Sequence, residues 1–152
     1  MTHKAAIEIR PAGGAAFKVI AALYGACFED DWPEPSVAEL MNSPGVWGLV
    51  AMVDATPAGF VLARVIAREA EILAIGTVPA QRRAGLARAL MTRAIAIAAP
   101  HADAMFLEVG ADNPSARALY LSLDFHEVGL RRDYYRRADG RRVDARILKC
   151  EF

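Results

Sequence analysis

The spacing of apolar and polar positions predicts a chain in which strands and helices alternate. Apolar residues at every second position indicate strands, and apolar residues recurring every three or four positions indicate helices. Strands are expected over residues 6–10, 46–53, 59–67, 71–78, 104–109, 125–130 and 143–150. Helices are expected over 15–27, from 36 to the Ser-Pro-Gly break at 43–45, over 86–99, and from 113 to about 123. The order β-α-α-β-β-β-α-β-α-β-β predicts an α/β protein whose mixed sheet carries helices on both faces.

Turn-forming and apolar runs indicate where several of these elements begin and end. Residues 11–14 (Pro-Ala-Gly-Gly) are expected to end the first strand, and 54–58 to form a hairpin turn. Residues 36–39 (Ser-Val-Ala-Glu) have the form of a capping box, which predicts that the second helix starts at its serine. Residues 131–142 are polar and are expected to form a loop with an Asp-Gly turn. The apolar run 72–75 predicts a strand at the centre of the sheet.

Composition and charge narrow the class of protein. The chain has 152 residues, 55% of them apolar, against about 45–50% in typical globular domains. One domain spanning residues 1–152 is therefore expected, and intrinsic disorder is excluded. Lys and Arg number 18, as do Asp and Glu, so no direct nucleic-acid partner is expected. Residues 1–80 carry 5 basic and 9 acidic side chains, whereas 81–152 carry 13 and 9, so an anionic ligand is expected on the second half.

The chain carries no signal for a membrane, a disulfide scaffold or a metal. No segment approaches the ~20 apolar residues of a membrane span, and no signal peptide is apparent, which leads us to expect a cytoplasmic protein. Cys27 and Cys150 are expected to be small buried hydrophobes. The three histidines are not spaced as metal ligands, so no metal is expected.

The sharpest local feature is a glycine-containing loop between a buried strand and a helix. It reads Val-Pro-Ala-Gln-Arg-Arg-Ala-Gly-Leu-Ala over residues 78–87. The amides at a helix start are unpaired and attract phosphate, and Gly85 allows the backbone to approach a ligand closely. Arg82, Arg83 and Arg88 add positive charge, so the loop suits a pyrophosphate. The alternative is a helix start with solvated arginines.

Further motifs accompany this loop in a fixed order. They are Glu69-Ala70-Glu71-Ile72, Leu107-Glu108-Val109, Asn113-x-x-Ala116-x-x-Leu119-Tyr120-x-x-Leu123-x-Phe125 and Arg131-Arg132-x-Tyr134-Tyr135. With Arg82-x-x-Gly85-x-Ala87, this set resembles the GNAT N-acetyltransferase superfamily, most strongly from about residue 69 to 148. The Arg-Arg-x-Tyr-Tyr segment is similar to the branch that acetylates the N-terminal alanine of a small-subunit ribosomal protein.

The resemblance implies a fold, a cofactor and the residues that contact it. The implied fold is a central mixed, mostly antiparallel sheet with helices on both faces, and the acetyl donor is acetyl-CoA, with no metal. The strand before the loop exposes its backbone to the acetyl group and pantetheine, at Ile75, Gly76 and Thr77. The pyrophosphate is held by the loop and the first helical turn, at Arg82, Arg83, Ala84, Gly85, Leu86, Ala87 and Arg88. Asn113 corresponds to a cofactor-contacting residue, and its alternative is a simple helix cap.

Two residues match the catalytic positions of the family. Glu108 corresponds to the general base that deprotonates the acceptor amine, whereas the residues alone leave open a strand glutamate that faces solvent. Tyr120 corresponds to the acid that protonates the departing thiolate, and its alternative is an aromatic core residue. Asn113 and Tyr120 are seven residues apart and so share one helix face. Direct transfer in a ternary complex is expected, without an acetyl-cysteine.

Three positions depart from the family pattern. Asp124 stands where glycine is common. Aspartate tolerates the left-handed conformation expected at this helix end better than most residues do. Gly76 replaces a bulkier residue in the acetyl-contacting strand, which is expected to loosen the site. Ala87 replaces a glycine of the loop, a change that the motif commonly allows.

The acceptor side is less well defined by sequence. The acidic segment 29–34 is expected either to attract a cationic N-terminus or to be a solvated loop. Tyr134 and Tyr135 are expected either to line the peptide channel or to pack within a hairpin. The resulting hypothesis is an N-acetyltransferase that acts on a protein N-terminus, as a monomer or weak dimer. The alternatives are an enzyme of the same fold that acetylates small amines, and a non-catalytic acyl-CoA sensor.

Overall fold

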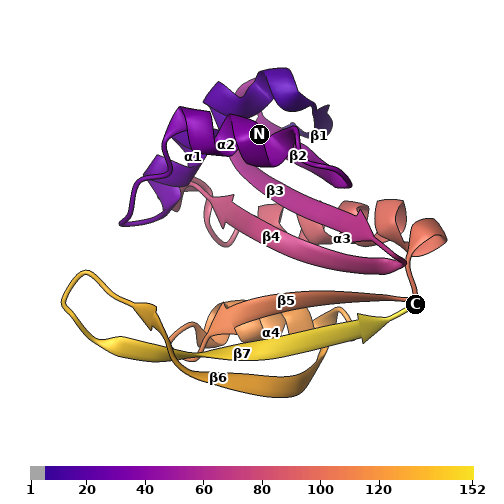
Figure 1. Ribbon diagram of the computed structural model, residues 1–152. Coiled ribbons are helices and arrows are strands. Elements are labelled where there is room, and N and C mark those ends of the chain that lie inside the picture. Colours follow the sequence, from indigo (N-terminus) through magenta and orange to yellow (C-terminus); the bar gives the residue numbers. More distant parts are fainter. Residues whose placement is uncertain (1–5) are drawn as a thin grey trace, which may run out of the picture. The chain divides into compact units, whose positions relative to one another are not determined.

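A computed structural model describes residues 6–152, so the first five residues of the expected domain lie outside the described part. The elements follow one another in the predicted order (Figure 1). The strands are β1 (Ile7–Ala12), β2 (Val46–Val53), β3 (Thr56–Ile66), β4 (Glu69–Thr77), β5 (Ala104–Gly110), β6 (His126–Arg136) and β7 (Arg142–Glu151). The helices are α1 (Phe17–Cys27), α2 (Glu34–Met41), α3 (Leu86–Ala98) and α4 (Pro114–Ser122), with 3-10 turns η1 (Gly14–Ala16), η2 (Pro79–Gln81) and η3 (Ala99–His101).

The strands hydrogen-bond in the order β1-β2-β3-β4-β5-β7-β6, which confirms the mixed, mostly antiparallel sheet. As predicted from its apolar run, β4 is the central strand. The described residues divide into two compact units, and β4 contributes to both. The first unit comprises residues up to Arg64 together with Leu73–Ala94, and the second comprises Val65–Ile72 and Ile95–Phe152.

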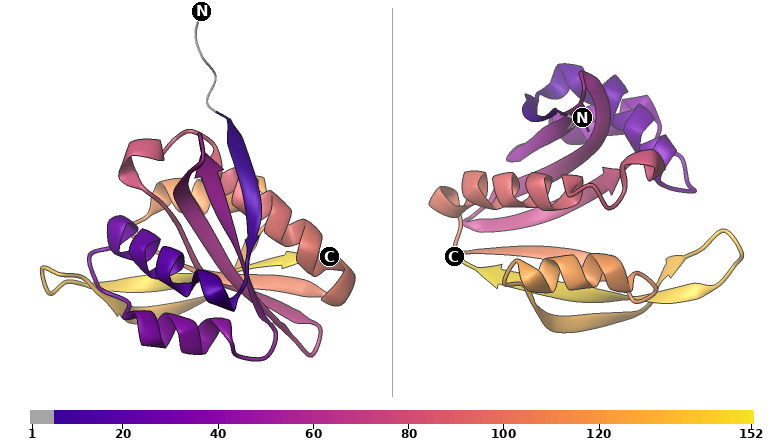
Figure 2. Two further views of the ribbon diagram at one scale, coloured as in Figure 1. Left: turned by 90° about the horizontal axis from the view of Figure 1, so that it is seen from above. Right: turned by 180° about the vertical axis from the view of Figure 1, so that it is seen from behind.

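In the first unit, helices cover both faces of the strands (Figure 2). One face packs against α1 and α2, in a core that includes Ile20, Leu23, Val37, Met41, Val50, Met52, Phe60 and Leu62. The alternate strand positions face α3, since a Cβ placed on Gly59 would lie 3.4 Å from the Leu90 side chain. The consecutive buried positions of β2 and β3 therefore pack against helices on both faces.

In the second unit, α4 covers one face of the β5-β7-β6 ladder. Met105 and Leu107 on β5 are buried, and Cys150, the partner of Met105, lies with its sulfur 3.8 Å from the Leu123 carbonyl at the end of α4. The alternating residues Phe106 and Glu108 lie on the opposite face. Because β5 runs parallel to the start of β4, the side chains of both strands are presented together on that face.

Two predicted element boundaries at the N-terminal end were wrong. β1 continues through Pro11, which pairs with Leu49, because β1 is an edge strand and a proline there removes no sheet hydrogen bond that the partner needs. The second helix starts at Glu34 and not at Ser36, with Pro33 as the capping residue and no side-chain cap. Proline suits the first helical turn because its missing N–H would be unpaired there in any case.

Two further predictions about turns were also wrong. Asp54 and Ala55 alone form the first hairpin turn, both with positive φ, so β3 begins earlier than predicted. The expected polar loop at 131–142 is largely strand: β6 extends to Arg136 and pairs with β7, with an irregularity between Arg131 and Tyr135. Edge strands that face solvent tolerate charged side chains, so polarity alone did not distinguish this strand from a loop.

No helix within residues 6–152 combines the length and the hydropathy that crossing a membrane requires.

Candidate active site

The junction from β4 to α3 is a tightly bonded loop in the first unit. The Arg82 guanidinium donates to the backbone carbonyls of Thr77 and Cys27, each at 3.2 Å, and so holds the loop against its surroundings. Arg83 and Gly85 have φ values of 68° and 82°. No atom approaches the position of a Cβ at Gly85, which leaves open space beside the start of α3. The first amides of a helix have no carbonyl partner within it, so this open space is a suitable cradle for an anion.

In the strand before the loop, side chains fill the space beside Gly76. A Cβ at this position would lie 3.0 Å from the Cys27 sulfur and 3.0 Å from a ring carbon of Phe60. Neighbouring side chains therefore occupy the space that a larger residue at position 76 would fill. Cys27 is a half-buried free thiol whose pKa burial raises, so it acts here as packing.

Substituting Gly76 by alanine is therefore expected to destabilise the protein. Overpacking of this kind costs about 1–3 kcal/mol, because neighbouring side chains must leave their rotamer minima. The free energy of unfolding, from denaturant titration, provides the measurement. Adding Cys27→Ala to Gly76→Ala removes the sulfur and is expected to restore part of the loss. A Gly76→Ala variant as stable as the parent chain contradicts this account of the packing.

In the second unit, Glu108 lines a pocket on the face of the β5-β7-β6 ladder that points away from α4. Its side chain is 27% exposed and accepts a hydrogen bond from Arg131 Nε at 2.9 Å. The pocket has a volume of about 180 Å³. It is lined by Glu69, Glu71, Phe106, Leu107, Glu108, Arg131 and Ile147. Three of the lining side chains are carboxylates, which attract a cation such as a protonated amine.

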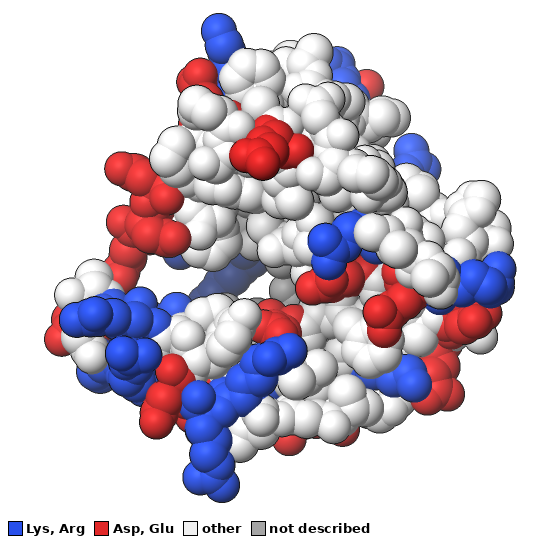
Figure 3. Space-filling model, viewed as in Figure 1, with Lys and Arg blue, Asp and Glu red and all other residues white. Residues whose placement is uncertain are grey.

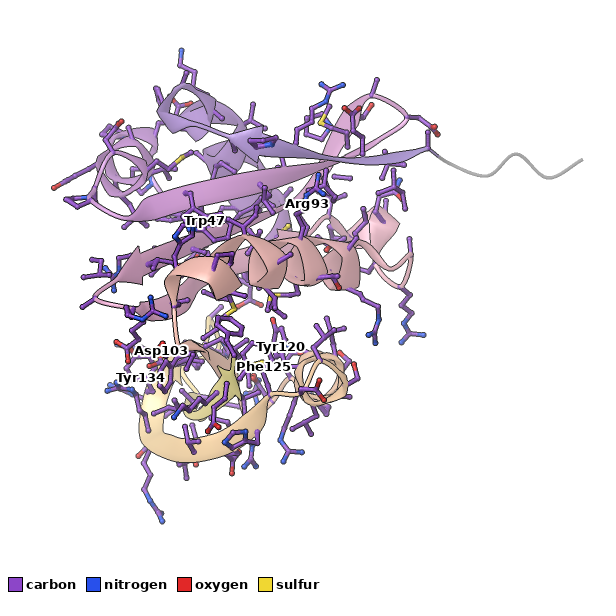
Figure 4. The ribbon with its side chains drawn as sticks, turned by 90° about the vertical axis from the view of Figure 1, so that its right-hand side faces the viewer. Trp47, Arg93, Asp103, Tyr120, Phe125 and Tyr134 are labelled. Carbon is purple, nitrogen blue, oxygen red and sulfur yellow. The ribbon has the colours of Figure 1, made fainter. Side chains whose placement is uncertain are left out.

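Tyr120 lies on α4 and is only 6% exposed. Figure 4 shows it beside Phe125, with ring centroids 6.1 Å apart in an edge-to-face arrangement. Burial, and to a lesser degree the neighbouring Tyr135, raise the pKa of Tyr120 to about 12. The phenol therefore stays protonated throughout the neutral range, and it can donate a proton or a hydrogen bond.

Asn113 caps α4 as predicted. Its Oδ1 accepts hydrogen bonds from the Ala116 amide at 3.2 Å and the Ser115 hydroxyl at 3.3 Å. The cap and the following Pro114 fix where the helix begins, and thereby the position of Tyr120 two turns later. At the other end of α4, Asp124 has a φ of 70°, which confirms the left-handed conformation expected there.

The two candidate acceptor-side segments have different surroundings. In the first unit, Asp30 of the acidic segment accepts a hydrogen bond from Tyr24 at 2.9 Å, and Trp32 packs edge-on against the same ring. In the second unit, Tyr134 and Tyr135 pack edge-to-face with each other, with centroids 5.1 Å apart. Figure 3 shows acidic side chains gathered over the α1–α2 connection and basic ones around the β6–β7 turn.

The structure thus gathers the predicted residues into two groups. Within the first unit it brings the Ile75–Gly76–Thr77 segment next to the Arg82–Arg88 loop. Within the second it places Glu108 in a chain of contacts through Arg131 and Tyr134 to Tyr135, whereas Tyr120 lies on α4, which covers the other face of the ladder.

Sequence reasoning assigned no role to Glu69 and Glu71, although their spacing contained a signal. Residues two apart in a strand face the same way, and β4 pairs Glu71 with Phe106 of β5, two positions before Glu108. The ion pair between Glu108 and Arg131 was also missed, because its partners are 23 residues apart and only the strand register brings them together.

Comparison with known proteins gives consistent matches over most of the chain. The model of the Acetyltransferase (GNAT) family matches residues 17–125. The N-alpha-acetyltransferase RimI of Mycobacterium tuberculosis is 35% identical over 112 residues, which cover 71% of this chain and 70% of that protein. The [Ribosomal protein bS18]-alanine N-acetyltransferase of Escherichia coli is 41% identical over 92 residues, or 60% of this chain and 62% of that enzyme. This alignment therefore spans less than two thirds of the E. coli relative.

Solved structures extend the likeness to nearly the whole chain. The ribosomal-protein-S18-alanine N-acetyltransferase from Escherichia coli superposes with a TM-score of 0.89 at 28% identity, covering 96% of this chain and 94% of the other. Arabidopsis thaliana NAA60 in complex with acetyl-CoA superposes with a TM-score of 0.85 at 18% identity, covering 97% and 99%. At that identity the second comparison shows a shared fold.

Proposed function

Because this chain belongs to the acetyltransferase (GNAT) family, we propose that it transfers an acetyl group from acetyl-CoA to the N-terminal α-amine of a protein. We further propose a small-subunit ribosomal protein with N-terminal alanine as the acceptor, since relatives that are 35–41% identical include enzymes named for that activity. The observation that carries the proposal lies in the second unit: a partly buried glutamate lines an acidic pocket, and a buried tyrosine whose pKa is raised to about 12 stays protonated.

The first unit supplies a suitable donor side. Open space beside Gly85 and the free amides at the start of α3 fit a pyrophosphate, with Arg83 and Arg88 adding charge. Arg82 contributes by fixing the loop through its bonds to Thr77 and Cys27. Backbone amides over 75–77 would stabilise negative charge that develops on the thioester oxygen.

The second unit supplies the proton transfers. A terminal α-amine has a pKa of about 7.7–8.0, so at neutral pH it must lose a proton before it can attack. Glu108 accepts that proton, the amine nitrogen bonds to the thioester carbon, and the carbon–sulfur bond breaks. Tyr120 then donates a proton to the departing thiolate. Glu69 and Glu71 surround the same pocket and favour the cationic form of the amine on arrival.

Replacing Arg83 with alanine is expected to weaken acetyl-CoA binding by about tenfold at low salt. The side chain is exposed, so its attraction to phosphate is screened and the effect shrinks as ionic strength rises. Titration calorimetry with acetyl-CoA at two salt concentrations measures this. Arg93→Ala, which removes an exposed arginine farther along α3, is the matched control and is expected to leave the Kd unchanged. Equal losses in both variants would refute a specific phosphate contact.

The acceptor is tested with peptides that vary in their first residue, set beside free amines and amino acids. We expect CoA release with peptides that begin with alanine. Turnover of free amines alone would replace the proposal by a small-molecule acetyltransferase. Binding of acetyl-CoA with no CoA release across the whole panel would identify an acyl-CoA sensor. Mass spectrometry of protein N-termini from cells with and without this protein then identifies the physiological acceptor.

A further inference from the structure

The turn after β5 is joined to the end of β6 by a two-pronged ion pair. Arg137 Nε lies 2.8 Å from Asp112 Oδ2, and Arg137 Nη2 lies 2.6 Å from Asp112 Oδ1. Both side chains are about one-third exposed, at 29% for Asp112 and 32% for Arg137. A bidentate guanidinium–carboxylate pair fixes orientation as well as distance, because both hydrogen bonds require one planar arrangement. It therefore sets the geometry of the two segments it connects.

The absence of a side chain at Gly110 leaves room for this ion pair. A Cβ at Gly110 would lie 2.5 Å from Arg137 Nη2 and 2.6 Å from Asp112 Oδ1, closer than any side chain can approach. Gly110 lies two residues after Glu108, at the end of β5. The pair thus sits directly over the strand that carries the proposed base.

The pair also holds an aromatic ring. The Arg137 guanidinium carbon lies 5.1 Å from the centroid of the Tyr135 ring, within the range of a cation–π contact. Burial raises the pKa of Tyr135, as does the nearby charge of Glu108. Tyr135 in turn raises the pKa of Tyr120. The Tyr135 ring also packs edge-to-face on Tyr134, and the Arg131 guanidinium that bonds Glu108 lies 5.4 Å from the centroid of the Tyr134 ring. Arg137 therefore contacts an aromatic pair that adjoins the Glu108–Arg131 ion pair.

We propose that Asp112 and Arg137 are positioning residues, which fix the Tyr135 ring in the aromatic pair next to the Glu108–Arg131 ion pair and so set the affinity for the acceptor peptide. This inference rests on the proposed function. Asp112 directly precedes the Asn113 cap of α4, so the same pair connects the Tyr135 ring to the helix that carries Tyr120. Loss of the pair leaves the catalytic groups in place but allows the ring to leave its position.

The test uses Asp112→Asn, Arg137→Gln and the double variant in the full chain. Each is expected to raise the KM for an alanine-initiated peptide by about tenfold, a modest cost for a mispositioned contact. The kcat and the KM for acetyl-CoA are expected to change by less than about twofold, since neither reacting group is removed. Both single changes break the ion pair, and Arg137→Gln also removes the contact with the Tyr135 ring. The double variant should therefore match Arg137→Gln and not multiply the two effects. Arg137→Lys keeps the charge without the two-pronged geometry and should restore activity only in part.

A second measurement does not depend on turnover. With ¹³C-labelled tyrosine, the Tyr135 ring resonances are expected to move toward values for a mobile ring in the variants. The matched control is Arg68→Gln, which breaks another arginine–aspartate pair of the same unit, 2.8 Å from Asp103, and should leave the ring resonances and the peptide KM unchanged.

The outcomes separate this inference from the proposed function. Unchanged Tyr135 resonances in Asp112→Asn and Arg137→Gln overturn the positioning role, whether or not the enzyme acetylates peptides. Shifted resonances with an unchanged peptide KM overturn the link to acceptor affinity. If the parent protein acetylates no peptide, the proposed function fails, and with it the acceptor role of the pair, while the resonances still decide whether the pair orders the ring.

Discussion

Replacing Glu108 with glutamine is expected to lower kcat by about 10²–10⁴-fold, the usual contribution of a positioned general base. Glutamine keeps the shape of the side chain and its place in the pocket, but it cannot accept a proton from the acceptor amine. Acetyl-CoA affinity should be retained, because Glu108 lies in the second unit and the proposed phosphate cradle lies in the first. Steady-state kinetics with a saturating alanine peptide measure the loss, and calorimetry measures the cofactor affinity.

The pH dependence gives this prediction a specific signature. Below the pKa of the amine, about 7.7–8.0, most acceptor molecules are protonated and require a base. Above it most are already neutral. The ratio of parent to Glu108→Gln activity should therefore be largest at low pH and fall as the pH rises through about 8. A ratio that stays constant across pH would indicate a role for Glu108 other than proton removal.

Glu127→Gln provides a matched control in the same unit. Glu127 pairs with Arg146 at 3.0 Å, and its side chain is 34% exposed, close to the 27% of Glu108. Arg146 stands opposite Val109, whereas Ile147 stands opposite Glu108, so the two ion pairs lie on opposite faces of the ladder. The control change is expected to leave kcat within about twofold. Equal losses in both variants would point to a structural effect of breaking strand ion pairs.

Tyr120→Phe is expected to lower kcat by about 10²-fold, the lower range for a proton donor. The aromatic ring and its contact with Phe125 are kept, so folding should be little affected and only the hydroxyl is lost. Acetyl-CoA binding should change little for the same reason. Kinetics at saturating concentrations of both substrates provide the measurement. A kcat equal to that of the parent would remove Tyr120 from the mechanism and leave it as a core residue.

The raised pKa of Tyr120 determines how proton donation by its hydroxyl depends on pH. Because burial raises it to about 12, the hydroxyl keeps its proton below pH 10, and kcat should show no loss from its ionisation in that range. In the unfolded chain the same group ionises near pH 10. The free energy of unfolding should therefore fall as pH rises from about 10 to about 12, because the unfolded state releases its proton first. Tyr120→Phe should remove this part of the alkaline destabilisation.

Tyr24→Phe is the control for loss of a tyrosine hydroxyl. The pKa of Tyr24 is also raised to about 12, mainly by burial and then by its hydrogen bond to Asp30. It lies on α1 in the first unit, whereas Tyr120 lies on α4 in the second. At saturating substrates its kcat is expected to remain within about twofold of the parent value.

Local sequence signals predicted most of the secondary structure because they act over a few residues. The apolar run at 72–75 placed β4 at the centre of the sheet, and Asn113-Pro114 marked the start of α4. The second helix was misplaced because two prolines near Glu34 favour an earlier start than the capping-box pattern. Residues 131–136 were misjudged because the pairing of β6 with β7 overrides their polarity.

The sequence by itself determined the order of elements, the strand–loop–helix junction at Gly85 and the identities of Glu108 and Tyr120 as candidates. Only the tertiary structure decided their surroundings. Arg131 reaches Glu108 across 23 residues, and Arg137 reaches Asp112 across 25. Such contacts depend on strand register and on which face each side chain takes, and a one-residue shift in register would move every one of them to the opposite face. Periodicity specifies that a face exists, whereas pairing across the sheet specifies which distant residues meet on it.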